Sequence, residues 1–445
     1  SADEIEKSMA TDLKGITKYQ ADTSVRFLPS RTSPAFYNTG RGGNEGINVR
    51  GMEGNRVLLQ VDGVRLPMTF DNGPFMAGRG DYLDPEAFKQ VEILRGASST
   101  AHGSDGLGGA VSFVTKDPKD LLTLGKPVQV ALKTTYSSVD KSTSLVPSVA
   151  FVQGDYEGML LASLRRGHEV KTGGTNDAAD YTRTTANPQD RASDYVLGKL
   201  SYKIDAKNKI KLTIEDSQKD YQTNTLSLLG DTYYGLGVGR TDARSSEDIA
   251  RSLLKLDFEF DDASATHVQK AKVSVFAQKS DNAQYGYEKR NSIAYNSRDR
   301  LYSYNEDAVG LSAQAESRIQ GDVSHRLVYG FDLADTQVGT MATGGNYRDG
   351  VALTGPSGST TAGFTANKQF PDTDYRTLGV FLSDDIAYNQ WLITPALRYE
   401  QFSLTPKTGD PLYTVNNTLT QAKLSGQELS PKIGAMWQQS ELFKP

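Results

Sequence analysis

The chain contains, after about residue 125, a long series of strand-like stretches in which apolar and polar residues alternate. In Leu254–Phe260 every second residue is apolar and each residue between them is charged. Similar alternation recurs in Val128–Lys133, Ile210–Glu215 and Trp391–Glu400. Successive side chains of a strand point to opposite faces, so these stretches predict a sheet with one apolar and one charged face. The apolar face must meet either a protein core or lipid.

Composition restricts the choice between these two partners. Only 37% of the 445 residues are hydrophobic, the mean hydropathy is −0.50, and no apolar run approaches the roughly 18 residues of a membrane-spanning helix. A helical membrane protein is therefore excluded, whereas a β-barrel is allowed because half of each strand faces a polar lumen. The 22 tyrosines and 16 phenylalanines fit the aromatic bands of membrane barrels.

Three further features exclude other classes. The chain has no cysteine, which excludes a disulfide scaffold and a cysteine-ligated metal site. Its net charge of −5 argues against a nucleic-acid-binding surface. The first ten residues lack the basic start and apolar core of a signal peptide, so we expect a mature or trimmed product.

The lengths of the connections favour a membrane barrel over a soluble β-sandwich. About twelve alternating stretches are present, and most are near ten residues or longer, whereas average strands have about five or six. Short connections at 154–158, 205–208, 261–266, 321–324 and 389–390 alternate with mostly long polar ones at 171–194, 223–248, 291–300, 343–375 and 405–426. In an up-and-down barrel this order places the short turns at one rim and the long loops at the other.

The first 125 residues or so lack this regular alternation and combine short apolar stretches with glycine-rich segments. A capping-box-like Ser1-x-x-Glu4 predicts a short helix from Ser1 to about Lys14. Short strands are expected around 57–61, 91–94 and 110–115, with glycine-rich loops at 40–46 and 73–80.

This N-terminal part resembles the plug domain of TonB-dependent outer-membrane receptors. The resemblance begins with Ile47–Met52 and Asn55–Val64 and continues through Leu83–Pro85, Val91–Gly96 and Gly103–Val111, in the family's order and spacing. It implies an all-β transmembrane barrel of 22 antiparallel strands with an N-terminal α+β plug domain inside the lumen. We therefore expect residues 1–125 to form the plug and residues 126–445 the first part of a truncated barrel, without a TonB box before Ser1. A closed twelve-strand barrel is the alternative, although its lumen would be too small for the plug.

The strand after the plug and the stretch Leu164–Glu169 resemble the haem and haemoglobin receptor branch of this family. That resemblance implies import of haem, including haem taken from haemoglobin, across the outer membrane of a Gram-negative bacterium. The TonB–ExbB–ExbD complex would supply the energy, lipopolysaccharide would surround the barrel, and haem would be the transported ligand rather than a catalytic cofactor. The alternative is transport of a ferric siderophore or another scarce nutrient, which predicts a basic and aromatic vestibule without axial ligands.

Two other classes fit the sequence less well. A passive pore has no plug, and a barrel hydrolase needs a nucleophile, a base and an acid at spacings that the chain does not offer. The sequence therefore predicts a receptor rather than an enzyme.

By similarity, the two plug loops that face outward are Arg31–Gly43 and Leu66–Tyr82. Glycine, aromatic and charged residues gather there, a mixture common at binding surfaces and also in mobile surface loops. We expect ligand contacts from Phe36, Tyr37, Arg41, Met68, Phe70, Phe75 and Tyr82. In an alternative interpretation, the apolar members anchor the loops against the barrel wall.

Imidazole and phenolate both bind haem iron, so the candidate iron ligands are Tyr82, His102 and His168. A packed structural histidine is the alternative for His102, and an ordinary surface residue is the alternative for His168. A plug inside a lumen must also meet a polar wall, and carboxylates pair well with guanidiniums in partly buried places. We expect such plug–wall contacts from Arg50, Glu92 and Arg95, unless these side chains hold the plug itself together.

Overall fold

The protein is described by a computed structural model, which covers residues 1–31, 46–68, 70–72, 75–77, 82–96, 103, 105–230, 239–292, 295–353, 366–414 and 422–438. Within these ranges, no helix has the length and apolar character needed to cross a membrane.

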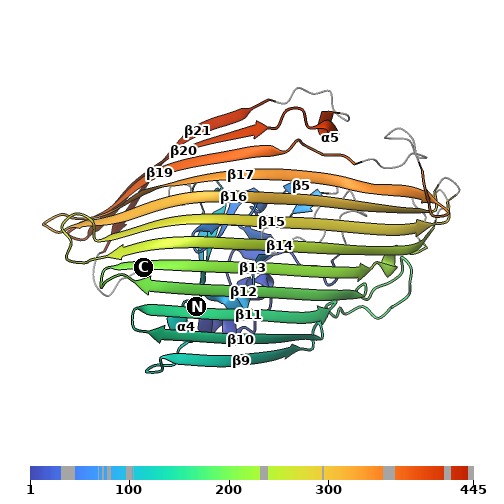
Figure 1. The fold of residues 1–445 in the computed structure, drawn as a ribbon, viewed down its shortest axis with the longest axis horizontal. Coiled ribbons are helices and arrows are strands. Elements are labelled where there is room, and N and C mark those ends of the chain that lie inside the picture. The colour runs from blue at the N-terminus through green and yellow to red at the C-terminus, as the bar shows by residue number, and fades with distance from the viewer. Residues whose placement is uncertain are drawn as a thin grey trace.

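The described residues after 127 form a 13-stranded antiparallel sheet in which neighbouring strands follow chain order (Figure 1). Its strands are β9 (Val128–Ser137), β10 (Ser142–Gln153), β11 (Tyr156–His168), β12 (Gln189–Lys203), β13 (Asn208–Asn224), β14 (Arg240–Asp261), β15 (Lys270–Arg290), β16 (Ser297–Ile319), β17 (Ser324–Arg348), β18 (Val351–Ala352), β19 (Thr373–Tyr388), β20 (Trp391–Pro406) and β21 (Leu424–Trp437). The short β18 pairs only with β17, and β9 and β21 lie at the two ends of the sheet.

The two faces of this sheet are as different as the alternation predicts. On β14, Leu254, Leu256 and Phe258 point outward and are 38–51% exposed, while Lys255 and Asp257 point inward and are 1–2% exposed. Charged side chains are buried because they face the lumen and the material inside it, and the apolar face is turned outward. This arrangement confirms the predicted transmembrane barrel wall.

We expected all long connections at one rim of the wall and all short ones at the other. The structure shows this separation less regularly. The connection 169–188 lies at one rim, at the right of Figure 1, and the end of β17 and the start of β19 lie at the same rim. The same rim also carries the short connection 138–141, and there β15 ends at Arg290 and β16 already begins at Ser297. The predicted long loop 291–300 is therefore shorter than expected, because its last four residues belong to β16.

The plug, which we define as the elements from α1 to α4, lies against the inner side of the curved sheet (Figure 1). Its helices are α1 (Ala2–Lys7), α2 (Leu13–Thr17) and α4 (Pro118–Leu121), with 3-10 turns at Gly54–Arg56 and Pro85–Ala87. Its strands are β1 (Thr23–Val25), β2 (Ile47–Val49), β3 (Val57–Val61), β4 (Val64–Arg65), β5 (Phe70–Asn72), β6 (Phe75–Ala77), β7 (Phe88–Arg95) and β8 (Gly109–Thr115). Outside the plug, the wall connections carry the 3-10 turn Leu226–Leu228 and helix α5 (Pro411–Thr414).

The core of the plug is the mixed sheet β4-β3-β8-β7, in which β3 and β8 run parallel. Val61, Val111 and Phe113 are at most 1% exposed, and the same apolar cluster includes Tyr195 and Leu197 of β12. The plug therefore packs its core directly against the wall.

The start of the plug corrects one prediction. The Ser1–Glu4 capping box is present, but the expected helix from Ser1 to Lys14 is divided into α1 and α2. Helix α1 ends because Met9 adopts a left-handed conformation with φ of 48°, which no residue inside a right-handed helix has.

Candidate ligand site and its attachment to the wall

The first of the two plug loops that we expect to face outward begins at Arg31, which is fixed firmly to the barrel wall. Arg31 is 5% exposed and donates from Nε to Oε2 of Glu247 on β14 at 2.8 Å, and its guanidinium lies 4.3 Å from the ring centroid of Tyr221. The Arg31 carbonyl accepts hydrogen bonds from Gln189 Nε2 at 2.9 Å and from Thr223 Oγ1 at 2.7 Å. A buried hydrogen bond between two charged groups is among the strongest that side chains make.

The second loop is attached to the wall at both of its ends. The Met68 amide donates to Glu306 Oε1 of β16 at 2.8 Å, and Tyr304 donates to the same oxygen at 2.6 Å. At the other end, Asn282 Nδ2 of β15 donates to the Tyr82 hydroxyl oxygen at 2.6 Å. The structure therefore assigns Met68 and Tyr82 contacts with the wall at the base of the loop.

Several predicted ligand residues cannot be placed by their side chains. Phe36, Tyr37, Arg41 and His102 lie outside the described residues. The backbones of Phe70 and Phe75 are described and form the antiparallel hairpin β5–β6. Their side-chain contacts therefore stay predictions.

The two described candidates for iron ligation are placed away from open space in the lumen. Tyr82 is 1% exposed and its oxygen is hydrogen-bonded to the wall, so the phenol serves as a plug–wall contact. His168 follows the buried Gly167 on β11 and shares the outward face with Leu164, and its Nδ1 lies 3.0 Å from Asp190 Oδ1. The structure therefore corrects the expectation that His168 reaches the vestibule.

The predicted plug–wall arginines make contacts within the plug instead. Arg50 donates from Nε to Asp22 Oδ2 at 3.2 Å, and Arg95 donates from Nε to the Ala21 carbonyl at 3.0 Å. Glu92 lies on β7 and is exposed. For Arg50 and Arg95 these contacts match the alternative interpretation, in which the side chains hold the plug together, and they correct the prediction of wall contacts.

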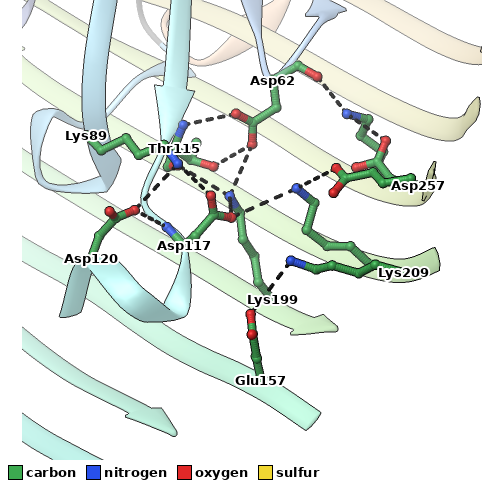
Figure 2. Close-up of polar contacts among 12 residues, drawn as sticks. Asp62, Lys89, Thr115, Asp117, Asp120, Glu157, Lys199, Lys209 and Asp257 are labelled. Carbon is green, nitrogen blue, oxygen red and sulfur yellow. Dashed lines mark hydrogen bonds and ion pairs between the residues drawn. The ribbon is translucent and has the colours of Figure 1, made fainter. Parts of the chain in front are cut away.

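We expected arginines of the plug to pair with acids of the wall. In the main ionic contact between plug and wall the charges are reversed, with acids on the plug and lysines on the wall (Figure 2). Asp62, in the turn between β3 and β4, accepts a hydrogen bond from the Thr115 amide at 3.0 Å and lies 3.5 Å from Lys199 Nζ of β12. Lys255 Nζ of β14 donates to the Asp62 carbonyl at 2.6 Å. Lys199 and Lys255 are each 2% exposed, so both ammonium groups depend on these partners.

Asp117, just before α4, completes this lysine–aspartate network. It lies 3.0 Å from Lys199 Nζ, 3.9 Å from Lys211 Nζ of β13, and 2.5 Å from Lys89 Nζ of the plug itself. Burial alone would raise the pKa of Asp117, but these three cations outweigh burial and hold its pKa below the ordinary value. The pKa of Asp62 is lowered for the same reason, since Lys199 and the hydrogen bonds from Thr115 outweigh its burial. Both carboxylates are therefore charged at neutral pH.

A second cluster of charges lies nearer to the rim with the long loops. Glu288 of β15 is 0% exposed, and its carboxylate is within 2.7 Å of Arg240 Nε and 2.5 Å of Arg290 Nη2, and also contacts Arg298. The Arg290 guanidinium lies 5.7 Å from the Tyr295 ring centroid. This part of the lumen is basic and aromatic.

Sequence comparison identifies both parts of the chain. The TonB-dependent receptor plug domain matches residues 1–110, and the TonB-dependent receptor-like β-barrel matches residues 201–445. The chain is 31% identical over 215 residues to the haemoglobin and haemoglobin-haptoglobin-binding protein A of Haemophilus influenzae. It is 28% identical over 207 residues to transferrin-binding protein A of the same species. These matches cover 45% and 44% of this chain, but only 19% and 22% of the two relatives.

The fold is similar to that of solved receptors of this kind. The FrpB iron transporter from Neisseria meningitidis, in its F5-1 variant, matches with a TM-score of 0.68 and 18% identity. The match covers 98% of this chain and 62% of the transporter. The chain therefore belongs to the TonB-dependent receptors, the plugged β-barrel receptors of the Gram-negative outer membrane, which are not enzymes.

Proposed function

We propose that this receptor imports haem through the outer membrane, with haemoglobin as one source and with energy from a TonB–ExbB–ExbD complex. Residues 1–125 would act as the plug and residues 126–445 as part of the barrel, which lipopolysaccharide surrounds. The observation that carries the proposal is the attachment of both outward-facing plug loops to the wall through Arg31, Met68 and Tyr82. A ligand held between these loops would therefore be held by plug and wall together. The haemoglobin-binding relative supports haem as that ligand.

Energised import follows from the strength of the contacts that close the lumen. Removing one partner from a buried ion pair costs roughly 3–5 kcal/mol, and Lys199 and Lys255 are both buried against the plug. Thermal motion, at about 0.6 kcal/mol, rarely separates several such contacts at once. External work on the plug would separate them, and the inner-membrane complex would supply that work.

A haemin titration of the purified full-length protein in detergent tests the proposal. We expect a Soret shift that saturates below micromolar haemin. Arg31→Gln should weaken binding about tenfold, because the loop loses a buried, charged hydrogen bond at its base. Arg50→Gln is the matched control and should bind as the wild type does, since Arg50 pairs with Asp22 away from that loop. Absence of a shift, together with tight binding of a ferric siderophore, would refute haem import.

The basic cluster around Glu288 favours a second candidate function, uptake of a ferric siderophore. Arg240, Arg290 and Arg298 face the lumen beside Tyr295, and anionic iron chelates are attracted to guanidinium and aromatic groups together. Parallel titrations with haemin, ferric citrate and a ferric catecholate distinguish the two functions. Saturation by one chelate in the absence of haemin binding would establish the siderophore function.

A further inference from the structure

A chamber of about 540 Å³ lies between the plug and the inner side of the wall. On the plug side it is lined by the β3–β4 hairpin, and on the wall side by strands from β12 to β20. Met68, at the base of the second outward-facing loop, also lines it, so the chamber starts directly beneath that loop. Its volume lies within the range of pockets that bind small molecules, roughly 300–1,000 Å³.

One side of the chamber is apolar because two phenylalanine rings are drawn back against the wall. Phe276 of β15 is paired with Gly310 of β16, and a Cβ on that glycine would lie 2.2 Å from the ring. Phe381 of β19 is paired with Gly330 of β17, where a Cβ would lie 2.9 Å from the ring. Each ring therefore occupies the space that the Cβ of any residue other than glycine would take at the paired position. The wall keeps an aromatic surface without closing the space in front of it.

The other side of the chamber carries charged side chains of both signs, and its lysines are Lys199, Lys211, Lys255 and Lys272. Lys199 and Lys255 are buried in contacts with the plug, but Lys272 of β15 is 41% exposed although it faces the lumen. Its nearest carboxylates, on Asp257 and Glu259, are each 3.6 Å from Nζ. Lys272 therefore presents an ammonium group to the chamber that can still accept an anionic partner.

We propose that this chamber is a second ligand site, below the capture loops, which holds one molecule with an apolar face and an anionic group. Phe276, Phe381 and Ala308 contact the apolar face, and Lys272 pairs with the anion. Size and chemistry suit a porphyrin that carries carboxylates. The inference rests on the proposed function, since it assigns the imported ligand a holding position between capture and release.

The test counts haemin equivalents bound by the full-length protein in detergent. The wild type should bind two, one at the capture loops and one in the chamber. Ala308→Trp fills the chamber, because Ala308 lines it and is 8% exposed, and should reduce the count to one. Ala277→Trp, on the outward face of β15, is the matched control and should bind as the wild type does.

A milder substitution keeps the test valid if the bulky one disturbs folding. Lys272→Gln should weaken only one of the two equivalents about fivefold, the size of an exposed ion pair, and this loss should shrink at high salt. Lys279→Gln, on the outward face of the same strand, should change nothing.

Two outcomes would overturn the inference, and they differ. If the wild type binds haemin and neither Ala308→Trp nor Lys272→Gln changes that binding, the chamber is not a ligand site, but the proposed function stands. Absence of haemin binding in the wild type would refute the proposed function, and the chamber as a haem site with it.

Discussion

The substitution Asp117→Asn tests whether the lysine–aspartate network holds the plug against the wall. Asparagine has the same shape and can still cap α4, so the change removes the charge and little else. Lys199 Nζ, at 2% exposure, then keeps a single carboxylate partner, Asp62 at 3.5 Å instead of Asp117 at 3.0 Å. The perturbation therefore weakens one buried ammonium group without leaving it entirely unpaired.

The expected loss of free energy that holds the plug to the wall lies between two limits. An exposed ion pair contributes about 0.2–1 kcal/mol, and breaking a fully buried pair costs about 3–5 kcal/mol. Asp117 is 32% exposed and Asp62 remains in place, so we expect about 2 kcal/mol, between those limits. Since about 1.4 kcal/mol corresponds to a factor of ten, local opening of the plug should become about thirtyfold more frequent.

Hydrogen–deuterium exchange measured by mass spectrometry reports this opening. Peptides that contain β3 and β8 should exchange faster in Asp117→Asn, whereas peptides from β14 should not change. Asp216→Asn, an outward-facing control that accepts a hydrogen bond from Ser252, should leave all peptides unchanged. In a Lys199→Met background, Asp117→Asn should have a much smaller effect, because the pair acts as a unit. Equal acceleration in that background, or none in the wild type, would refute the reasoning.

Three further predictions concern the plug. Tyr82→Phe removes one buried hydrogen bond to the wall and should destabilise the plug by about 1 kcal/mol in the same exchange assay. The haemin spectrum should stay unchanged, and a lost Soret shift would instead show that the phenol is an iron ligand. Gly109→Ala should disturb the plug more than Gly51→Ala. The φ angle is positive at both sites, but only at Gly109 would the new Cβ meet backbone, at 2.4 Å from the Leu94 carbonyl oxygen. Equal exchange in the two variants would contradict this. Because the pKa values of Asp62 and Asp117 are lowered in the folded state, their contribution is complete above the ordinary value of 3.8 and is lost as the pH falls below it. Pepsin should therefore begin to cleave the plug between pH 4 and pH 2, whereas the same digestion of the Asp117→Asn variant should start at higher pH.

The fold was predictable because its signal is local. Alternation in Leu254–Phe260 assigned Lys255 and Asp257 to the lumen, and both are buried there. The break between α1 and α2 was not predictable. Glycine and asparagine are the residues that usually indicate a left-handed conformation, and the residue that adopts it here is Met9.

The contacts between plug and wall were not predictable, because they join positions far apart in sequence. Arg31 and Glu247 are separated by 216 residues, and the Asp62 carbonyl and Lys255 by 193. Plug motifs singled out Arg50 and Arg95, but a motif cannot reveal whether an arginine faces its own domain or the wall. Only the three-dimensional arrangement distinguishes Arg31 from these two.

The plug is held by different chemistry at its two ends, and this difference determines how it can open. Towards the rim with the long loops, the attachments through Met68 and Tyr82 are hydrogen bonds, and that of Arg31 adds backbone and ring contacts to its ion pair. Towards the rim with short turns, the attachment is the lysine–aspartate network around Asp62. Acid and salt weaken the ionic contacts at both ends, but the hydrogen bond between Asn282 and Tyr82 joins neutral groups and stays in place, as do the hydrogen bonds to the Arg31 carbonyl. The network end should therefore release first while the capture loops stay attached, which would let a held ligand move inward before the outer site is lost.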